Sequence, residues 1–75
     1  MSISPEQCRM GRAALHISVR ELAERAGVST ATISRFENDR PVGQPDALER
    51  IRTALEARGL EFIDGHSPGV RLREL

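Results

Sequence analysis

Apolar residues recur at helical spacing in two separate segments, one near the start of the chain and one after its middle. Ser4-Pro-Glu-Gln7 fits a capping box with proline at the first helical position, and it opens a helix predicted over about Pro5 to Leu15. A later helix is predicted from Pro45 to about Arg58, with Gly59 closing it. The apolar face of this later helix carries Leu48, Ile51, Ala54 and Leu55.

Between these segments, residues 19 to 38 are predicted to form two short helices joined by a tight turn. Ser18 and Glu21 have the spacing of a second capping box, and Gly27 stands where a residue with positive φ ends a helix. Ser29 is the N-cap candidate of the next helix. The inward apolar positions are Leu22, Ala23, Ala26, Val28, Ile33 and Phe36. This is the pattern of a helix-turn-helix, whose second helix can lie in the DNA major groove.

The outward face of that second helix carries side chains suited to a DNA groove. Small residues at Thr30, Ala31 and Ser34 allow close approach, and Arg35 has the reach and geometry to bind the O6 and N7 atoms of guanine. The alternative is an amphipathic surface helix whose polar face is only solvated. Two caps, a glycine turn and an apolar Val28 in register favour DNA reading over that alternative.

The last sixteen residues have strand character. Residues 60–64 and 70–73 flank a turn signal over 65–69, so a β-hairpin is predicted. A lone hairpin is marginal in water, and its apolar residues need a covering surface. They are Phe62, Ile63, Val70 and Leu72. Either the tail folds back on its own helices, or it helps to build a dimer by edge-to-edge strand pairing, which is the arrangement favoured here. We therefore divide the chain into a helical domain at residues 1–59 and a dimerisation tail at 60–75.

Composition limits the function classes. The chain has 75 residues and a net charge of zero, which is not the basic footprint of a nucleic-acid binder. It contains eleven arginines and no lysine. Binding to DNA is therefore expected to depend on dimerisation and to weaken with salt. Cys8 is the single cysteine and is predicted to be a small buried hydrophobe, while His16 and His66 have no partners at metal-ligand spacing. No catalytic set, cofactor motif, signal peptide or membrane span is found, so a cytoplasmic protein that is not an enzyme is expected.

Several of these residues together resemble a known family. Leu22-Ala23, Gly27-Val28-Ser29, Ile33 and Phe36-Glu37-Asn38 are similar to the lambdoid phage repressor and Cro fold, also called the XRE family, over about residues 4 to 58. The resemblance implies a compact all-α domain of four to five helices, here followed by a β-hairpin or strand extension, that binds operator DNA as a dimer.

The resemblance also implies roles for individual residues. Those expected to face bases are Thr30, Ala31, Ser34 and Arg35, and those expected near phosphates are Ser18, Arg20, Thr32, Asn38 and Arg40. Arg12 and Glu37 stand where the family often has a partly buried ion pair. The glutamines common at the start of the recognition helix are Thr30 and Ala31 in this chain, so no base preference is carried over.

The sequence therefore predicts a DNA-binding transcriptional regulator, a repressor that occupies a palindromic operator as a homodimer. A dimer would place its two recognition helices about 34 Å apart, one turn of DNA. Two alternatives stay open. One is an antitoxin or controller protein that regulates its own operon and also binds a partner protein. The other is a protein-interaction module without DNA binding, which the neutral charge permits.

Overall fold

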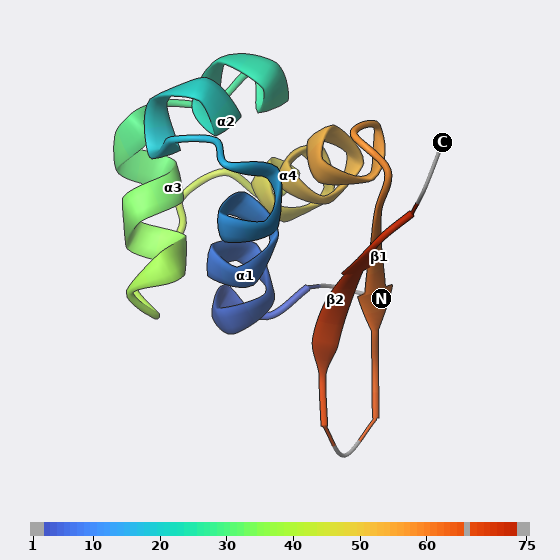
Figure 1. Cartoon of the computed structure of the whole chain (residues 1–75). Helices are drawn as coiled ribbons and strands as arrows, with labels where there is room; N and C mark the ends of the chain where they lie inside the picture. The colour runs from blue at the N-terminus through green and yellow to red at the C-terminus, as the bar shows by residue number, and fades with distance from the viewer. Residues whose placement is uncertain (1–2, 66, 74–75) are drawn as a thin grey trace.

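The computed structural model describes residues 3–65 and 67–73, so His66 and the end of the tail lie outside it. The described chain contains four helices followed by a two-stranded antiparallel hairpin (Figure 1). The elements are α1 (Pro5–Leu15), α2 (Val19–Ala26), α3 (Thr30–Glu37), α4 (Ala47–Glu56), β1 (Leu60–Ile63) and β2 (Gly69–Leu72). This order confirms the mainly helical domain and the terminal hairpin predicted from the sequence.

Serine caps begin three of the four helices. The Ser4 hydroxyl accepts from the Gln7 N–H and the Gln7 side chain returns to the Ser4 N–H, so the first capping box is complete. Ser18 also accepts from the N–H of Glu21. The carboxylate of Glu21 instead binds Nε of Arg25 at 3.1 Å. The second capping box is therefore only half formed, because an arginine one turn later takes the carboxylate.

The start of α4 differs from the prediction. The helix begins at Ala47 and not at Pro45, and its N-cap residue Asp46 makes no side-chain capping bond. The Ala47 N–H donates to the carbonyl of Gln44, which closes a tight turn over residues 44–47 before the regular helical bonds begin. Pro45 therefore lies in this turn, where its fixed φ is also favourable.

The link between α2 and α3 is the turn that the glycine pattern predicts. Gly27 has φ 70°, in the left-handed region, and the Val28 N–H donates back to the carbonyl of Ala23. Ser29 then caps α3 by accepting from the N–H of Thr32. The chain thus changes direction within three residues, and α3 packs against α2.

One core joins the helices and the hairpin. Its largest fully buried apolar side chains are Leu22, Ile33, Ile51, Leu55, Leu60 and Cys8. Leu60 belongs to β1 and approaches α1 so closely that a Cβ added at Gly11 would lie 2.6 Å from its Cδ2. The core therefore continues past Gly59 into the hairpin.

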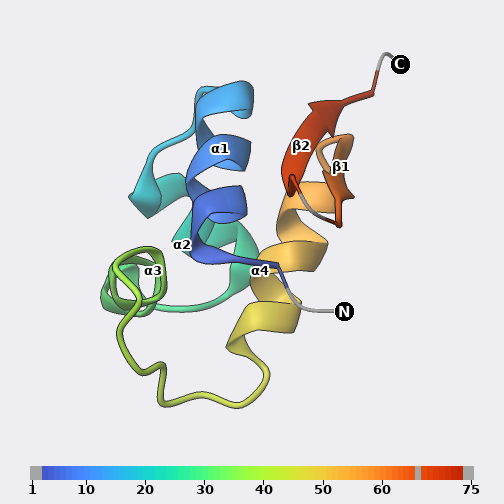
Figure 2. The same ribbon diagram turned by 90° about the horizontal axis from the view of Figure 1, so that it is seen from below.

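The hairpin packs on its own helices and leaves two large apolar side chains exposed. Its strands pair with Leu60 opposite Leu72 and Ile63 opposite Gly69, and β2 lies beside α1 (Figure 2). Phe62 and Val70 are partly buried against the core. Ile63 is 42% exposed and Leu72 is 48% exposed. Of the two arrangements weighed for the tail, packing on its own helices is present for part of its apolar residues.

No helix of the described chain has the length and apolar character needed to cross a bilayer.

Candidate nucleic-acid interface

The outward face of α3 is the strongest candidate for a functional surface. Thr30, Ala31, Ser34 and Arg35 are all exposed there, whereas Ile33 and Phe36 are buried on the opposite side. The glycine turn and the Ser29 cap fix the start of α3 against α2, so these four residues project from a rigid element. The helix therefore presents to solvent the side chains that sequence analysis assigned to base contacts.

The residues expected near phosphates differ in their exposure to solvent. Ser18, Arg20, Asn38 and Arg40 are exposed near the ends of α2 and α3. Thr32, in contrast, is only 8% exposed, and its hydroxyl lies 3.0 Å from that of Ser29. Asn38 uses its amide to close α3, with Nδ2 donating to the Ser34 carbonyl at 2.7 Å. Thr32 is therefore part of the capping structure of α3 and is poorly placed to meet a phosphate.

In the described part of the chain, the arginines without a carboxylate partner lie near the C-terminal end of α3 and just beyond it. Nine of the eleven arginines have a guanidinium nitrogen within 4.0 Å of a carboxylate oxygen. Within the described residues, Arg35 and Arg40 are the two arginines without such a partner. The Arg40 N–H donates to the Arg35 carbonyl at 2.8 Å, which keeps the two residues adjacent. The zero net charge therefore conceals a local cationic site at the end of α3.

Asp39 lies within this cationic site and carries a carboxylate. It has φ 60°, a left-handed conformation that costs less for aspartate than for most residues with a side chain. Its N–H donates to the carbonyl of Phe36 as the chain leaves α3. This conformation turns the chain so that Arg40 returns towards Arg35.

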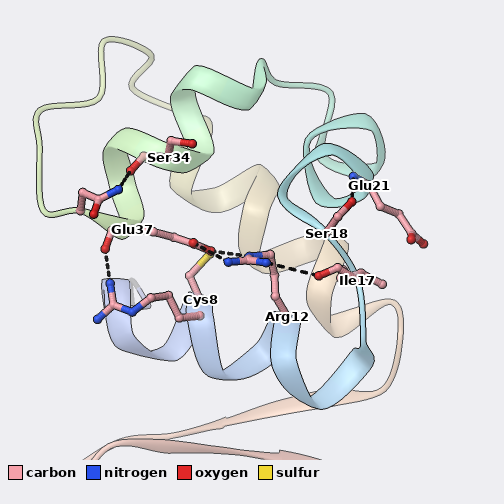
Figure 3. A network of polar contacts seen from close by, with 9 residues as sticks. Cys8, Arg12, Ile17, Ser18, Glu21, Ser34 and Glu37 are labelled. Carbon is pink, nitrogen blue, oxygen red and sulfur yellow. Dashed lines mark hydrogen bonds and ion pairs between the residues drawn. The ribbon is translucent and has the colours of Figure 1, made fainter.

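Helix α1 holds the far end of α3 through the carboxylate of Glu37 (Figure 3). Arg12 binds both carboxylate oxygens, with Nε at 2.7 Å and Nη2 at 2.8 Å. Cys8 donates its thiol hydrogen to the same carboxylate at 3.1 Å, and Arg9 donates to the Glu37 backbone carbonyl. Arg12 also reaches the carbonyl of Ile17 at 3.3 Å. Helix α3 is therefore anchored to α1, and Arg12 links this contact to the loop before α2.

The ionisation states in this cluster follow from its geometry. Burial alone would raise the pKa of Glu37, but hydrogen bonds from Arg12 and Cys8 and the charges of Arg12 and Arg9 outweigh it and lower the pKa. Burial raises the pKa of Cys8, and its hydrogen bond to Glu37 and the charge of that carboxylate raise it further. The hydrogen bond to Glu37 raises the pKa of Arg12. The cluster is thus a carboxylate, a neutral thiol and a guanidinium.

Three side-chain contacts of α1 were not predicted from the sequence. Cys8 is buried as predicted, but its hydrogen bond to Glu37 was not predicted, and neither were the contacts of Arg9 and Gln7. The capping-box pattern identified Gln7 only as a local cap. The partners of these side chains lie 28 or more positions away in the sequence, so helical spacing carries no signal for them.

The comparison with known families agrees with this geometry. A family model described as a helix-turn-helix domain matches residues 6–62, which covers α1 from its second residue, all of α2, α3 and α4, and most of β1. No curated protein matches the chain. The match includes the turn at Gly27, the capped α3 and the α1 residues that anchor it. The chain belongs to the helix-turn-helix family of DNA-binding domains.

Proposed function

We propose that this protein is a sequence-specific transcriptional regulator of the lambda repressor and Cro type, which represses by occupying a palindromic operator as a homodimer. The observation that carries the proposal is the position of the two arginines without carboxylate partners among the described residues. Arg35 is exposed near the C-terminal end of α3, the helix that follows the turn at Gly27, and Arg40 is exposed three residues beyond that helix. A helix face that is only solvated would not require these two arginines to be without carboxylate partners.

In this proposal, α3 lies in the major groove. Arg35 binds a guanine through two parallel hydrogen bonds, while Thr30, Ala31 and Ser34 allow the helix to approach the base edges. Arg40 binds a phosphate, and Ser18, Arg20 and Asn38 contact the backbone on either side of the groove. Thr32 is left out because its hydroxyl already lies 3.0 Å from that of Ser29.

Dimerisation supplies the affinity that one copy lacks. Because most arginines are matched by carboxylates, a single domain offers few phosphate contacts and is expected to bind weakly. The described chain has two exposed large apolar side chains, and both belong to the hairpin. We propose that the hairpin joins two copies and places their α3 helices in successive major grooves, so that repression follows from occupancy of a promoter.

Salt-dependent binding to duplex DNA tests the roles of the two arginines. We expect Arg35→Ala to cost about 1–3 kcal/mol on a selected site and to relax one base position. Arg40→Ala should weaken binding to all duplexes and flatten the salt slope. Fluorescence anisotropy over a range of salt concentrations measures both effects.

Arg58→Ala is the matched control, because Arg58 lies after α4 and pairs with Glu21 at 3.6 Å. If Arg35→Ala and Arg40→Ala bind DNA as tightly as Arg58→Ala and the wild-type protein do, α3 is not the DNA-reading surface. If no duplex is bound at any salt concentration, the chain is better described as a protein-interaction module.

A further inference from the structure

Gln7 is a buried polar residue with contacts that reach beyond its own helix. Its side chain is 2% exposed and lies between the first turn of α1 and the hairpin. The Oε1 atom accepts from the Ser4 N–H at 2.9 Å. The Nε2 atom donates to two carbonyls, those of Ile63 and Gly69, each at 3.1 Å. These two residues face each other in the hairpin, so one amide binds both strands.

This amide uses both of its N–H donors and its carbonyl oxygen. A glutamine side chain has two N–H donors and one carbonyl acceptor, and all three groups are engaged here. Such a site is sensitive to the loss of a donor, because two backbone carbonyls would then face an atom that cannot satisfy them. The contact is therefore specific to an amide and is not explained by side-chain volume alone.

The hairpin has two different attachments to the helices. Near its base, Leu60 is 2% exposed and fills the space above Gly11 of α1. At the turn end, Gln7 binds the carbonyls of the Ile63–Gly69 pair. Between them, Phe62 and Val70 are partly buried against the core, so without the Gln7 contacts the turn end of the hairpin would lose its polar anchor to α1.

Helix α1 connects this attachment to the recognition helix. It lies between α3 and β2 in both views of the molecule (Figures 1 and 2). Gln7 contacts the hairpin, and the next two residues, Cys8 and Arg9, contact Glu37 at the end of α3. A single turn of α1 therefore touches both the element proposed to join two copies and the element proposed to read DNA.

We propose that Gln7 is a positioning residue, whose amide locks the hairpin onto α1 and so fixes the hairpin relative to α3. The spacing part of this inference rests on the proposed function. If two copies join through their hairpins, the Gln7 attachment sets the distance between their recognition helices and hence the half-site spacing that the dimer accepts.

The test uses Gln7→Glu, with Gln44→Glu as the matched control. The Gln7→Glu variant keeps an acceptor for the Ser4 N–H but loses both donors, whereas Gln44 is exposed in the loop before α4. We expect hairpin backbone amides to exchange with solvent at least about tenfold faster in Q7E than in Q44E at neutral pH, because two hydrogen bonds are lost. On acidification, the protonated carboxyl regains one O–H donor, so the ratio between the variants should fall. Gln7→Met, which keeps the side-chain volume without burying a charge, separates the two roles: a purely space-filling side chain predicts hairpin exchange as slow as in the wild-type protein, whereas loss of both donors predicts faster exchange.

The wild-type protein provides a second measurement in case Q7E does not fold. By NMR, the two side-chain N–H protons of Gln7 should exchange more slowly than those of Gln44 by at least about tenfold. Equal exchange of the two side chains would overturn the proposal, as would equal hairpin protection in Q7E and Q44E at every pH.

Operator spacing tests the positioning role itself. The wild-type dimer should discriminate against operators with one inserted or deleted base pair, and Q7E should lose at least about threefold of that discrimination. Faster hairpin exchange with unchanged spacing preference would overturn the positioning role. If the wild-type protein binds no DNA, the proposed function fails, whereas the exchange measurements still decide whether Gln7 holds the hairpin.

Discussion

At the scale of single residues, Glu37 is a buried charge that the fold keeps ionised. It is 6% exposed and receives hydrogen bonds from Arg12 and Cys8 of α1. Because its pKa is lowered in the folded protein, the ionised carboxylate adds to the free energy of unfolding above the pKa of the unfolded chain, about 4.3. This contribution is lost as the pH falls through the lower pKa of the folded state.

Glu37→Gln should therefore destabilise the protein in a pH-dependent way. At neutral pH we expect a loss of about 3 kcal/mol, because Arg12 is left without its carboxylate partner in a partly buried position. The difference from the wild-type protein should begin to shrink below about pH 4, where the carboxylate of the unfolded chain takes up a proton before that of the folded protein does. Denaturant unfolding at a series of pH values measures this.

Glu49→Gln is the control for that series, since Glu49 is exposed and has no ion pair among the residues described. Its stability should follow that of the wild-type protein at each pH. A constant gap between Glu37→Gln and the wild-type protein from pH 7 to pH 3 would contradict the account of this carboxylate.

At the same scale, the sequence predicted which side chains are exposed better than it predicted which side chains contact each other. The outward position of Arg35 follows from helical spacing, and the pairing of Arg12 with Glu37 was implied only by family resemblance. The thiol contact of Cys8 and the amide contacts of Gln7 were not predicted. They depend on how α1 crosses α3 and the hairpin, and a linear pattern contains no information on that crossing.

At the scale of elements, helix α3 depends on a cap at its start. Helix α3 has only eight residues, too few to be stable alone. Ser29 accepts from the Thr32 N–H at 3.1 Å and holds the Thr32 hydroxyl at 3.0 Å. This cap satisfies a backbone donor that would otherwise lie unpaired and orders the turn that leads into α3.

Ser29→Ala should cost about 1 kcal/mol of stability, the usual value of a serine N-cap. Ser34→Ala in the same helix is the control, because Ser34 is exposed and only its backbone carbonyl accepts a hydrogen bond, from Asn38. Thermal unfolding followed by circular dichroism compares the two variants. Equal melting temperatures for Ser29→Ala and Ser34→Ala would show that the cap contributes nothing.

Elements that depend on local interactions were predictable from the sequence. Helices that begin with serine caps were placed correctly at their first residue, because the cap is a local interaction. The start of α4 was wrong by two residues, since Pro45 fits a turn as well as a first helical turn. The hairpin was predicted as an element, but its attachment to α1 was not, because that attachment is long-range.

At the scale of the whole molecule, the hairpin is both part of the core and the carrier of exposed apolar groups. Side chains alternate across a strand and paired residues share a face, so Leu72 lies on the face of Leu60, and Ile63 on the opposite face. Ile63 and Leu72 therefore do not form one continuous patch. Deleting the tail would also remove Leu60 from the core, so point substitutions are the better test of dimerisation.

We expect the wild-type protein to be a dimer. Either Ile63→Ser or Leu72→Ser should raise the dissociation constant of this dimer by about tenfold, as expected when one apolar side chain is lost from an interface. The variant that weakens the dimer identifies which face of the hairpin is buried in the interface. Sedimentation equilibrium measures the dissociation constant, with Ala57→Ser on an exposed position after α4 as control. Unchanged association in both variants would place the interface elsewhere.

Selection of bound sites from random duplex DNA tests the central claim most directly. The account predicts an inverted repeat whose half-sites lie about 10 base pairs apart, each with a guanine preference that disappears in Arg35→Ala. Recovery of a motif whose base preferences are all unchanged in Arg35→Ala, or of no motif at all, would contradict the assignment of α3 as the reading helix.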